Sequence, residues 1–130
     1  MDEARFADDH VSAIAARTGA VVIVITLAVA SLCPSSWLPR LLYSNNLEHF
    51  AGFYVLALAF AAARYRTRLT FVTRDVALLA TLLEAARWIL PGPRKGDLDH
   101  WMADLGGILA ASAPLVVAAF RQRFVRPQDL

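Results

Sequence analysis

Long apolar stretches alternate with short polar breaks along this chain. Four such stretches, each about 20 residues long with its flanks, predict helices at residues 11–32, 47–65, 70–90 and 98–121. A helix of about 20 residues spans roughly 30 Å, the thickness of the hydrocarbon core of a bilayer. The stretches are apolar on every face, as membrane-spanning helices are. The pattern therefore predicts an all-α fold, a transmembrane bundle of four helices.

The breaks between the stretches carry residues that end helices. Pro34 follows the first stretch, and Pro91-Gly92-Pro93 follows the third. Proline has no backbone N–H and cannot continue the helical hydrogen bonds. Tryptophans lie near the predicted span ends, where indole rings favour the membrane–water boundary: Trp37, Trp88 and Trp101. The alternative for the first stretch is a signal peptide ending at Cys33, but Leu32 is too large for the usual cleavage pattern.

Composition strengthens the membrane interpretation. The chain is 58% hydrophobic and 18% charged, with a mean hydropathy of +0.48. Soluble domains are about 45–50% apolar and about 25% charged, and 130 residues offer too small a core to hide the excess. Cys33 is the only cysteine, which excludes a disulfide scaffold. The basic residues are scattered between apolar runs, so we expect no nucleic-acid partner.

The distribution of Lys and Arg predicts an orientation. With four spans, one side holds nine of the thirteen basic residues: Arg5, Arg17, Arg64, Arg66, Arg68, Arg74, Arg121, Arg123 and Arg126. The other side holds four: Arg40, Arg87, Arg94 and Lys95. Because basic loops stay in the cytoplasm, we expect both termini to be cytoplasmic. The predicted location is the cell membrane, as a multi-pass protein of the bacterial inner membrane.

Polar residues from three different helices converge on the outer side in this topology. The candidate catalytic residues are His49, Glu84 and Asp104, and the candidate anion-binding residues are Arg87, Arg94 and Lys95. An ionisable residue inside a span costs a few kcal/mol unless it faces a partner or a cavity. Helix N-termini at the same level would add partial positive charge. These groups are suited to a phosphate or carboxylate, so membrane lipids are the expected partners.

Each of these residues also has a purely structural interpretation. Glu48 fits a capping box at the start of the second helix, and Asp97 or Asp99 fits an N-cap of the fourth. Glu84 and Arg87, three residues apart, share one helix face and can form an internal ion pair. His49 with Glu84, Asp104 and His100 would also suit a metal ion, but no tight metal-binding spacing is present. Neither a metal nor a cofactor is identified.

A stripe of small residues predicts how the fourth helix packs. Ala103, Gly107 and Ala111 repeat every four residues, a spacing that lets two membrane helices approach closely. Asp104 adjoins this stripe, so we expect its side chain to point into the bundle. Pro114 frees a backbone carbonyl in the second half of the helix and favours a kink there.

The order of these motifs resembles the VanZ-like family of small membrane proteins. The resemblance covers about residues 45–111. It rests on the run Asn45-Asn46-Leu47-Glu48-His49-Phe50, the late Glu84, the turn Pro91-Gly92-Pro93-Arg94, and Asp104-Leu105-Gly106-Gly107. It implies a single integral membrane domain over residues 1–130.

The resemblance also implies which residues of this chain form the site. By the family pattern His49, Glu84, Arg94, Asp104 and Gly107 match functional positions. The chain departs from the pattern where the family often has Asp-Lys instead of Asn45-Asn46 and Gln instead of Arg87. The family's loop aspartate would fall on His100. Ligand preference is therefore expected to differ from that of the founding member, which is linked to glycopeptide resistance.

Three functions follow as hypotheses. In the first, an outward-facing polar site recognises or modifies an anionic lipid or a lipid-linked cell-envelope precursor, with His49 or Glu84 as general acid or base and Asp104 orienting it. In the second, the protein is a non-catalytic scaffold or small subunit, and the charged cluster only stabilises the bundle. A proton-linked carrier ranks last, because four short helices would need to oligomerise. Whether the protein is an enzyme stays open.

Overall fold

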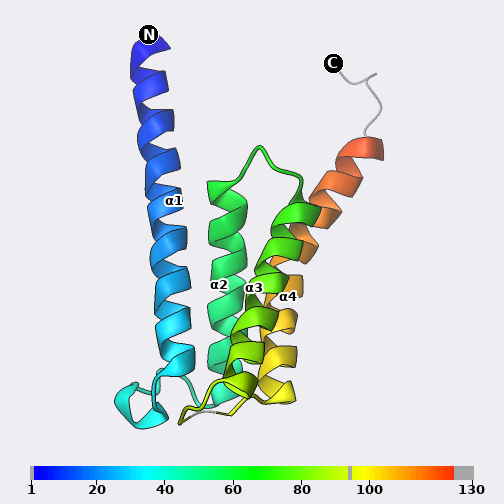
Figure 1. The fold of residues 1–130 in the computed structure, drawn as a ribbon. Coiled ribbons are helices and arrows are strands. Elements are labelled where there is room, and N and C mark those ends of the chain that lie inside the picture. The colour runs from blue at the N-terminus through cyan, green and yellow to red at the C-terminus, as the bar shows by residue number, and fades with distance from the viewer. Residues whose placement is uncertain (1, 94, 125–130) are drawn as a thin grey trace.

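The computed structural model describes residues 2–93 and 95–124, and the part of the chain that it describes is all-helical. The described residues form four α-helices, labelled in Figure 1, and one short 3-10 helix. They are α1 (Asp2–Leu32), η1 (Ser35–Trp37), α2 (Asn45–Ala63), α3 (Leu69–Ile89) and α4 (Leu98–Phe124). The predicted number of helices and their order along the chain are confirmed.

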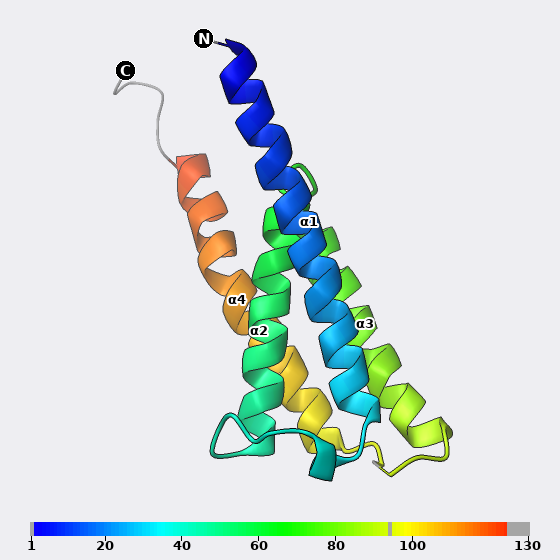
Figure 2. The ribbon, with the colours of Figure 1, turned by 90° about the vertical axis from the view of Figure 1, so that its left-hand side faces the viewer.

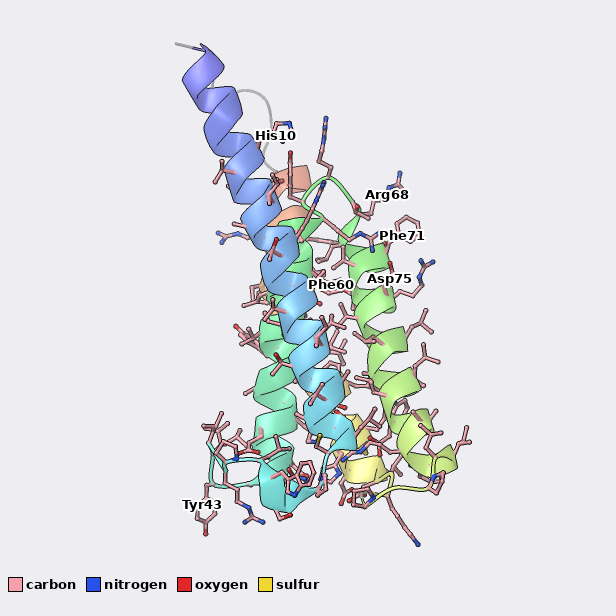
Figure 3. The ribbon with its side chains drawn as sticks, turned by 60° about the vertical axis from the view of Figure 1, so that its left-hand side comes forward. His10, Tyr43, Phe60, Arg68, Phe71 and Asp75 are labelled. Atoms are coloured by element: carbon pink, nitrogen blue, oxygen red, sulfur yellow. The ribbon has the colours of Figure 1, made fainter. Side chains whose placement is uncertain are left out.

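The four helices run alternately up and down, so the connections fall at two ends. The α1–α2 and α3–α4 connections lie together at one end, which we name the loop end (Figures 1 and 2). The start of α1, the end of α4 and the α2–α3 turn lie at the other, which we name the terminus end. Figure 3 places Tyr43 at the loop end and His10, Arg68 and Asp75 at the terminus end. The predicted gathering of the two polar connections at one end is therefore present.

α2 is the central helix of the bundle. It packs most extensively against α4 and also contacts α1 and α3. The core between these helices is formed by Phe53 and Leu56 of α2, Val76 of α3, and Ile108 and Ala111 of α4, all fully or almost fully buried. Because these side chains come from three helices, the apolar contacts fix how α2, α3 and α4 sit against one another.

Gly107 permits the close approach of α4 to α2. A Cβ atom at this position would overlap the Phe50 carbonyl oxygen and come within 3.0 Å of the Tyr54 backbone nitrogen. Gly107 and Ala111 are buried, so the small-residue stripe predicted from the sequence does face a neighbouring helix. Pro114 follows inside α4, and residues 113–122 are exposed where the helix diverges from α2 (Figures 1 and 2).

α1 packs on one side of the bundle and leaves much apolar surface uncovered. Its exposed residues include Val11, Val21, Ile25 and Val29. Within the described residues, three helical segments are long and apolar enough to cross a membrane: His10–Leu32, Asn45–Ala63 and Leu98–Gln122. A protein whose long helices expose apolar side chains in this way belongs in a membrane.

α3 is not among those three segments, although the sequence pattern predicts a span there. It carries four charged side chains, Arg74, Asp75, Glu84 and Arg87, within its 21 residues. These charges make α3 less apolar than the other helices. Two of them, Glu84 and Arg87, are buried inside the bundle.

The helix bounds differ from the predicted ones mainly at N-termini. α1 begins at Asp2 rather than at residue 11, because its polar first turns contain no Pro or Gly to stop a helix. α2 begins at Asn45, since Ser44 is its N-cap and accepts a hydrogen bond from the Leu47 backbone N–H (3.2 Å). The expected capping role of Glu48 is wrong: Glu48 instead accepts from the backbone N–H groups of Leu41 and Leu42.

Candidate functional site

A cavity of about 330 Å³ opens at the loop end, and we name it the loop-end cavity. Its walls come from α1, the α1–α2 connection, the first turns of α2 and α4, and the end of α3. The lining residues are Leu27, Ala30, Ser31, Leu38, Pro39, Arg40, Asn45, Glu48, His49, Arg87, Lys95 and His100. Three of them are cations and one is an acid, so the cavity is predominantly basic. Its volume corresponds to about ten water molecules, which is room for a small polar group.

His49 and Asp104 form a pair across the α2–α4 contact. His49 Nδ1 lies 2.9 Å from Asp104 Oδ1, and the side chains are only 10% and 3% exposed. Gly107, one turn further along α4, allows the helices to come close enough for this contact. Because Nδ1 is held by the carboxylate, Nε2 is the ring nitrogen of His49 left for a ligand in the cavity. Asp104 thus points into the bundle, as predicted.

A second histidine, His100, lies beside His49 in the wall of the cavity. The His100 ring stacks on the His49 ring, with centroids 4.7 Å apart and an angle of 19° between the planes. Asn45 Nδ2 lies 2.6 Å from His100 Nε2. An amide NH₂ group is a donor, so Nε2 accepts, and a neutral His100 then carries its proton on Nδ1. The two imidazoles are thereby oriented from opposite sides, one by Asp104 and the other by Asn45.

Glu84 and Arg87 form the ion pair that their spacing predicts. Arg87 Nη1 donates to Glu84 Oε2 at 2.7 Å, and the side chains are 2% and 8% exposed. The other carboxylate oxygen, Oε1, accepts a hydrogen bond from the Asp97 backbone N–H. Glu84 therefore ties the α3–α4 connection to α3, and both of its oxygens are engaged. This geometry gives Glu84 a positioning role rather than that of a free acid or base.

Two buried donors at this site lack an acceptor. Within the described residues, Arg87 Nε and His100 Nδ1 have no hydrogen-bond partner, and the nearest carboxylate oxygen to His100 Nδ1 is Asp97 Oδ2 at 3.8 Å. A buried donor without a partner costs about 1–3 kcal/mol, more if it is charged. Both residues line the loop-end cavity. Acceptor oxygens of a ligand that reached these two atoms would satisfy them.

Other polar residues at the loop end shape the connections. Asp97 Oδ1 accepts from the Asp99 backbone N–H at 3.1 Å, so Asp97 is the N-cap of α4 that the sequence suggests. Glu48 holds Leu41 and Leu42 through one carboxylate oxygen, at 2.7 and 2.9 Å. The α1–α2 connection is thereby fixed over the cavity, which brings Leu38 and Arg40 into its wall.

The structure brings most of the predicted site residues together. His49, Arg87 and Lys95 line the cavity, while Glu84 and Asp104 are buried directly behind it. Arg94 lies outside the described residues. Arg40, Asn45 and His100 also line the cavity. Asn45 and His100 belong to the motifs that resemble the VanZ-like family, whereas nothing in the sequence shows where Arg40 lies.

The donor set favours an anion over a metal ion. In the described part of the chain, no group of three or more His, Cys, Asp or Glu side chains is placed to hold a metal. The Asp104 carboxylate already contacts His49. The Glu84 carboxylate already accepts hydrogen bonds from Arg87 and from a backbone N–H. What faces the cavity is instead a set of N–H donors and cations, which suits phosphate or carboxylate oxygens.

Comparisons of the chain with protein-family models, with curated proteins and with solved structures find no match. The resemblance to the VanZ-like family stays a prediction from the sequence motifs.

Proposed function

We propose that the protein is a four-span integral membrane protein whose loop-end cavity binds the phosphate-bearing headgroup of an anionic lipid or a lipid-linked envelope precursor. In this proposal both termini are cytoplasmic, because nine of the thirteen basic residues lie on their side. The cavity then faces outward, at the level of the outer headgroups. The bacterial inner membrane is the compartment that fits this topology.

The connectivity supports α3 as the fourth span. α2 ends at the terminus end and α4 begins at the loop end (Figure 1), so the helix between them runs the full length of the bundle. Its charges do not oppose this placement. Glu84 pairs with Arg87 inside the protein, and Asp75 pairs with Arg64 and Arg74 at the terminus end. Between these charged groups, α3 packs into the bundle through an apolar face of buried residues, namely Val72, Val76 and Ala80.

The single observation that carries the proposed function is the pair of buried, unpartnered donors in a basic cavity. Arg87 Nε and His100 Nδ1 both require acceptors, while Arg40 and Lys95 add positive charge at the rim. Lys95 and Arg40 are exposed and reach the headgroup region, whereas Arg87 is almost completely buried. A phosphate provides several acceptor oxygens on one anion and meets both requirements.

The held imidazole of His49 favours lipid modification as a second candidate function. A carboxylate on Nδ1 fixes the orientation of the ring, as in catalytic dyads in general. In this version Nε2 takes the proton of a hydroxyl or water that attacks the headgroup phosphorus, the P–O bond to the leaving alcohol breaks, and the imidazolium returns the proton to that leaving oxygen. Asp104 orients the ring, and Arg87 stabilises phosphate charge. A scaffold role, in which the same pairs only hold the helices together, predicts instead no ligand in the cavity.

Lipid retention tests the binding proposal. The chain is inserted into nanodiscs of phosphatidylcholine with phosphatidylglycerol or phosphatidic acid, extracted mildly, and analysed by native mass spectrometry. K95Q changes an exposed residue, and the double variant E84Q/R87Q keeps a hydrogen-bonded pair while removing the buried charges. We expect both to retain less anionic lipid than the wild type, with the larger loss in the double variant.

A matched control comes from the terminus end. R68Q removes the same charge from an exposed residue far from the cavity (Figure 3) and should leave retention at the loop end unchanged. If K95Q and E84Q/R87Q fold normally and retain as much anionic lipid as the wild type, the cavity does not bind a headgroup. The scaffold role then replaces the proposed function.

A further inference from the structure

A second basic cavity lies at the terminus end, between the N-terminal half of α1 and the α2–α3 turn. Its volume is about 720 Å³, and we name it the terminus-end cavity. Arg17, Arg64, Arg66 and His10 line it, together with apolar residues such as Ile14. Figure 3 places His10 at this end, beside the turn that leads to Arg68. No acidic residue lines the cavity, so its lining carries at least three positive charges.

The arginines in this cavity differ in their partners. Arg64 Nη1 lies 2.5 Å from Asp75 Oδ2, and the other oxygen of Asp75 accepts from Arg74. Arg64 is therefore already neutralised. Among the described residues, no ion pair joins Arg17 or Arg66 to a carboxylate. These two guanidinium groups, one from α1 and one from the α2–α3 turn, have positive charge to offer to the cavity.

The depth of Arg17 shows what kind of ligand it requires. It lies seven residues beyond His10, where the apolar segment His10–Leu32 begins, which places its Cα about 10 Å along the helix axis. An arginine at that level of a span is unfavourable by a few kcal/mol unless it meets water or an anion. Ile14, one turn above, and Ala63 make the adjoining walls apolar. The lining of the cavity thus combines cationic and apolar side chains.

We propose that the terminus-end cavity binds the phosphate of an anionic phospholipid from the leaflet on that side, held between Arg17 and Arg66. Such a lipid links α1 to the α2–α3 turn at the end of the bundle where this cavity separates them. Its acyl chains extend along Ile14 and the exposed apolar face of α1, which Val21 and Ile25 continue. The proposal rests on the membrane insertion proposed above but not on the loop-end cavity.

The test uses the full chain in nanodiscs made of three parts phosphatidylcholine to one part phosphatidylglycerol. Native mass spectrometry after mild extraction measures the phosphatidylglycerol that each variant retains, in R17Q/R66Q, R66Q and R68Q. Each arginine near a charged headgroup contributes about 1 kcal/mol, so we expect about fivefold weaker retention for each cavity arginine removed. R68Q lies in the same turn but does not line the cavity, and should match the wild type.

Several results would overturn the proposal. One is unchanged retention in R17Q/R66Q, and another is an equal loss in R68Q, which would show an unspecific effect of charge. Inorganic phosphate that displaces phosphatidylglycerol from the detergent-extracted protein would identify a free anion as the ligand. If the double variant fails to fold, R66Q alone decides, because Arg66 is exposed on the turn. K95Q lowers retention only through the loop-end cavity, so adding R17Q/R66Q to K95Q should cause the same fold-loss as adding it to the wild type, which separates the proposal from the loop-end site.

Discussion

The two ends of the bundle place their charges in opposite ways. At the loop end, Glu84, Arg87 and Asp104 are almost completely buried and paired within the protein. At the terminus end, the ion pairs of Asp75 are open to solvent: the Arg64 and Arg74 side chains are 41% and 60% exposed. Buried pairs hold a fixed geometry because breaking one leaves an unpaired charge in an apolar interior. Exposed ion pairs contribute little to stability and are screened by salt.

This difference indicates which end of the bundle is suited to distinguish one ligand from another. The loop end fixes its donors before any ligand arrives, through the His49–Asp104 contact and the Glu84–Arg87 pair. A ligand there must fit the positions of those donors. The terminus end provides positive charge on exposed side chains, which suits a headgroup whose exact chemistry matters less. The first arrangement is typical of recognition, and the second of anchoring.

The largest expected effect comes from breaking the buried pair. Arg87→Ala leaves the Glu84 carboxylate buried without its cation, and we expect a loss of about 3–5 kcal/mol in the free energy of unfolding. Unfolding in mixed micelles with increasing SDS measures it. The double variant E84Q/R87Q should recover most of the loss, because neither charge remains. Equal destabilisation of both variants would show that the site does not depend on charge pairing.

A smaller effect is expected from closing the space between α2 and α4. In Gly107→Ala the added methyl group overlaps the Phe50 carbonyl, so the helices must separate, and overpacking of this kind costs about 1–3 kcal/mol. Gly19→Ala is the matched control, since nothing lies within 4 Å of a Cβ there. It should be neutral or slightly stabilising, as Ala favours helix more than Gly. Equal losses would contradict the close α2–α4 contact.

The smallest effect is expected at the terminus end. Asp75→Asn removes the exposed ion pairs with Arg64 and Arg74. Stability should fall less than in either variant above, and the difference from the wild type should shrink as salt is added. Thermal unfolding of the detergent-solubilised protein at low and high salt measures both. A loss as large as that of Arg87→Ala, or one independent of salt, would remove the contrast between the two ends.

The sequence predicts the helices and much of the loop-end site for clear physical reasons. Long apolar runs separated by short polar breaks define four helices, and alternating connections bring the polar ends together. The spacing of Glu84 and Arg87 predicts their pairing, and the small residues around Asp104 predict its burial. These are local or periodic features, so one sequence suffices to find them.

The remaining site residues depend on irregular backbone. Arg40 lines the cavity because it lies in the α1–α2 connection, which Glu48 holds through Leu41 and Leu42. No periodic pattern describes such a connection. The stacking of His100 on His49 likewise depends on the exact register of α4 against α2. The same applies to the terminus-end cavity, where Arg17 and Arg66 are far apart in the sequence.

A structure determined in a lipidic phase that contains an anionic phospholipid tests the central claim most directly. The account predicts a phosphate in the loop-end cavity, with oxygens within about 3.2 Å of Arg87 Nε and His100 Nδ1, and His49 still bonded to Asp104. A cavity that holds only water or has collapsed, in a protein with anionic lipid bound elsewhere, would contradict it.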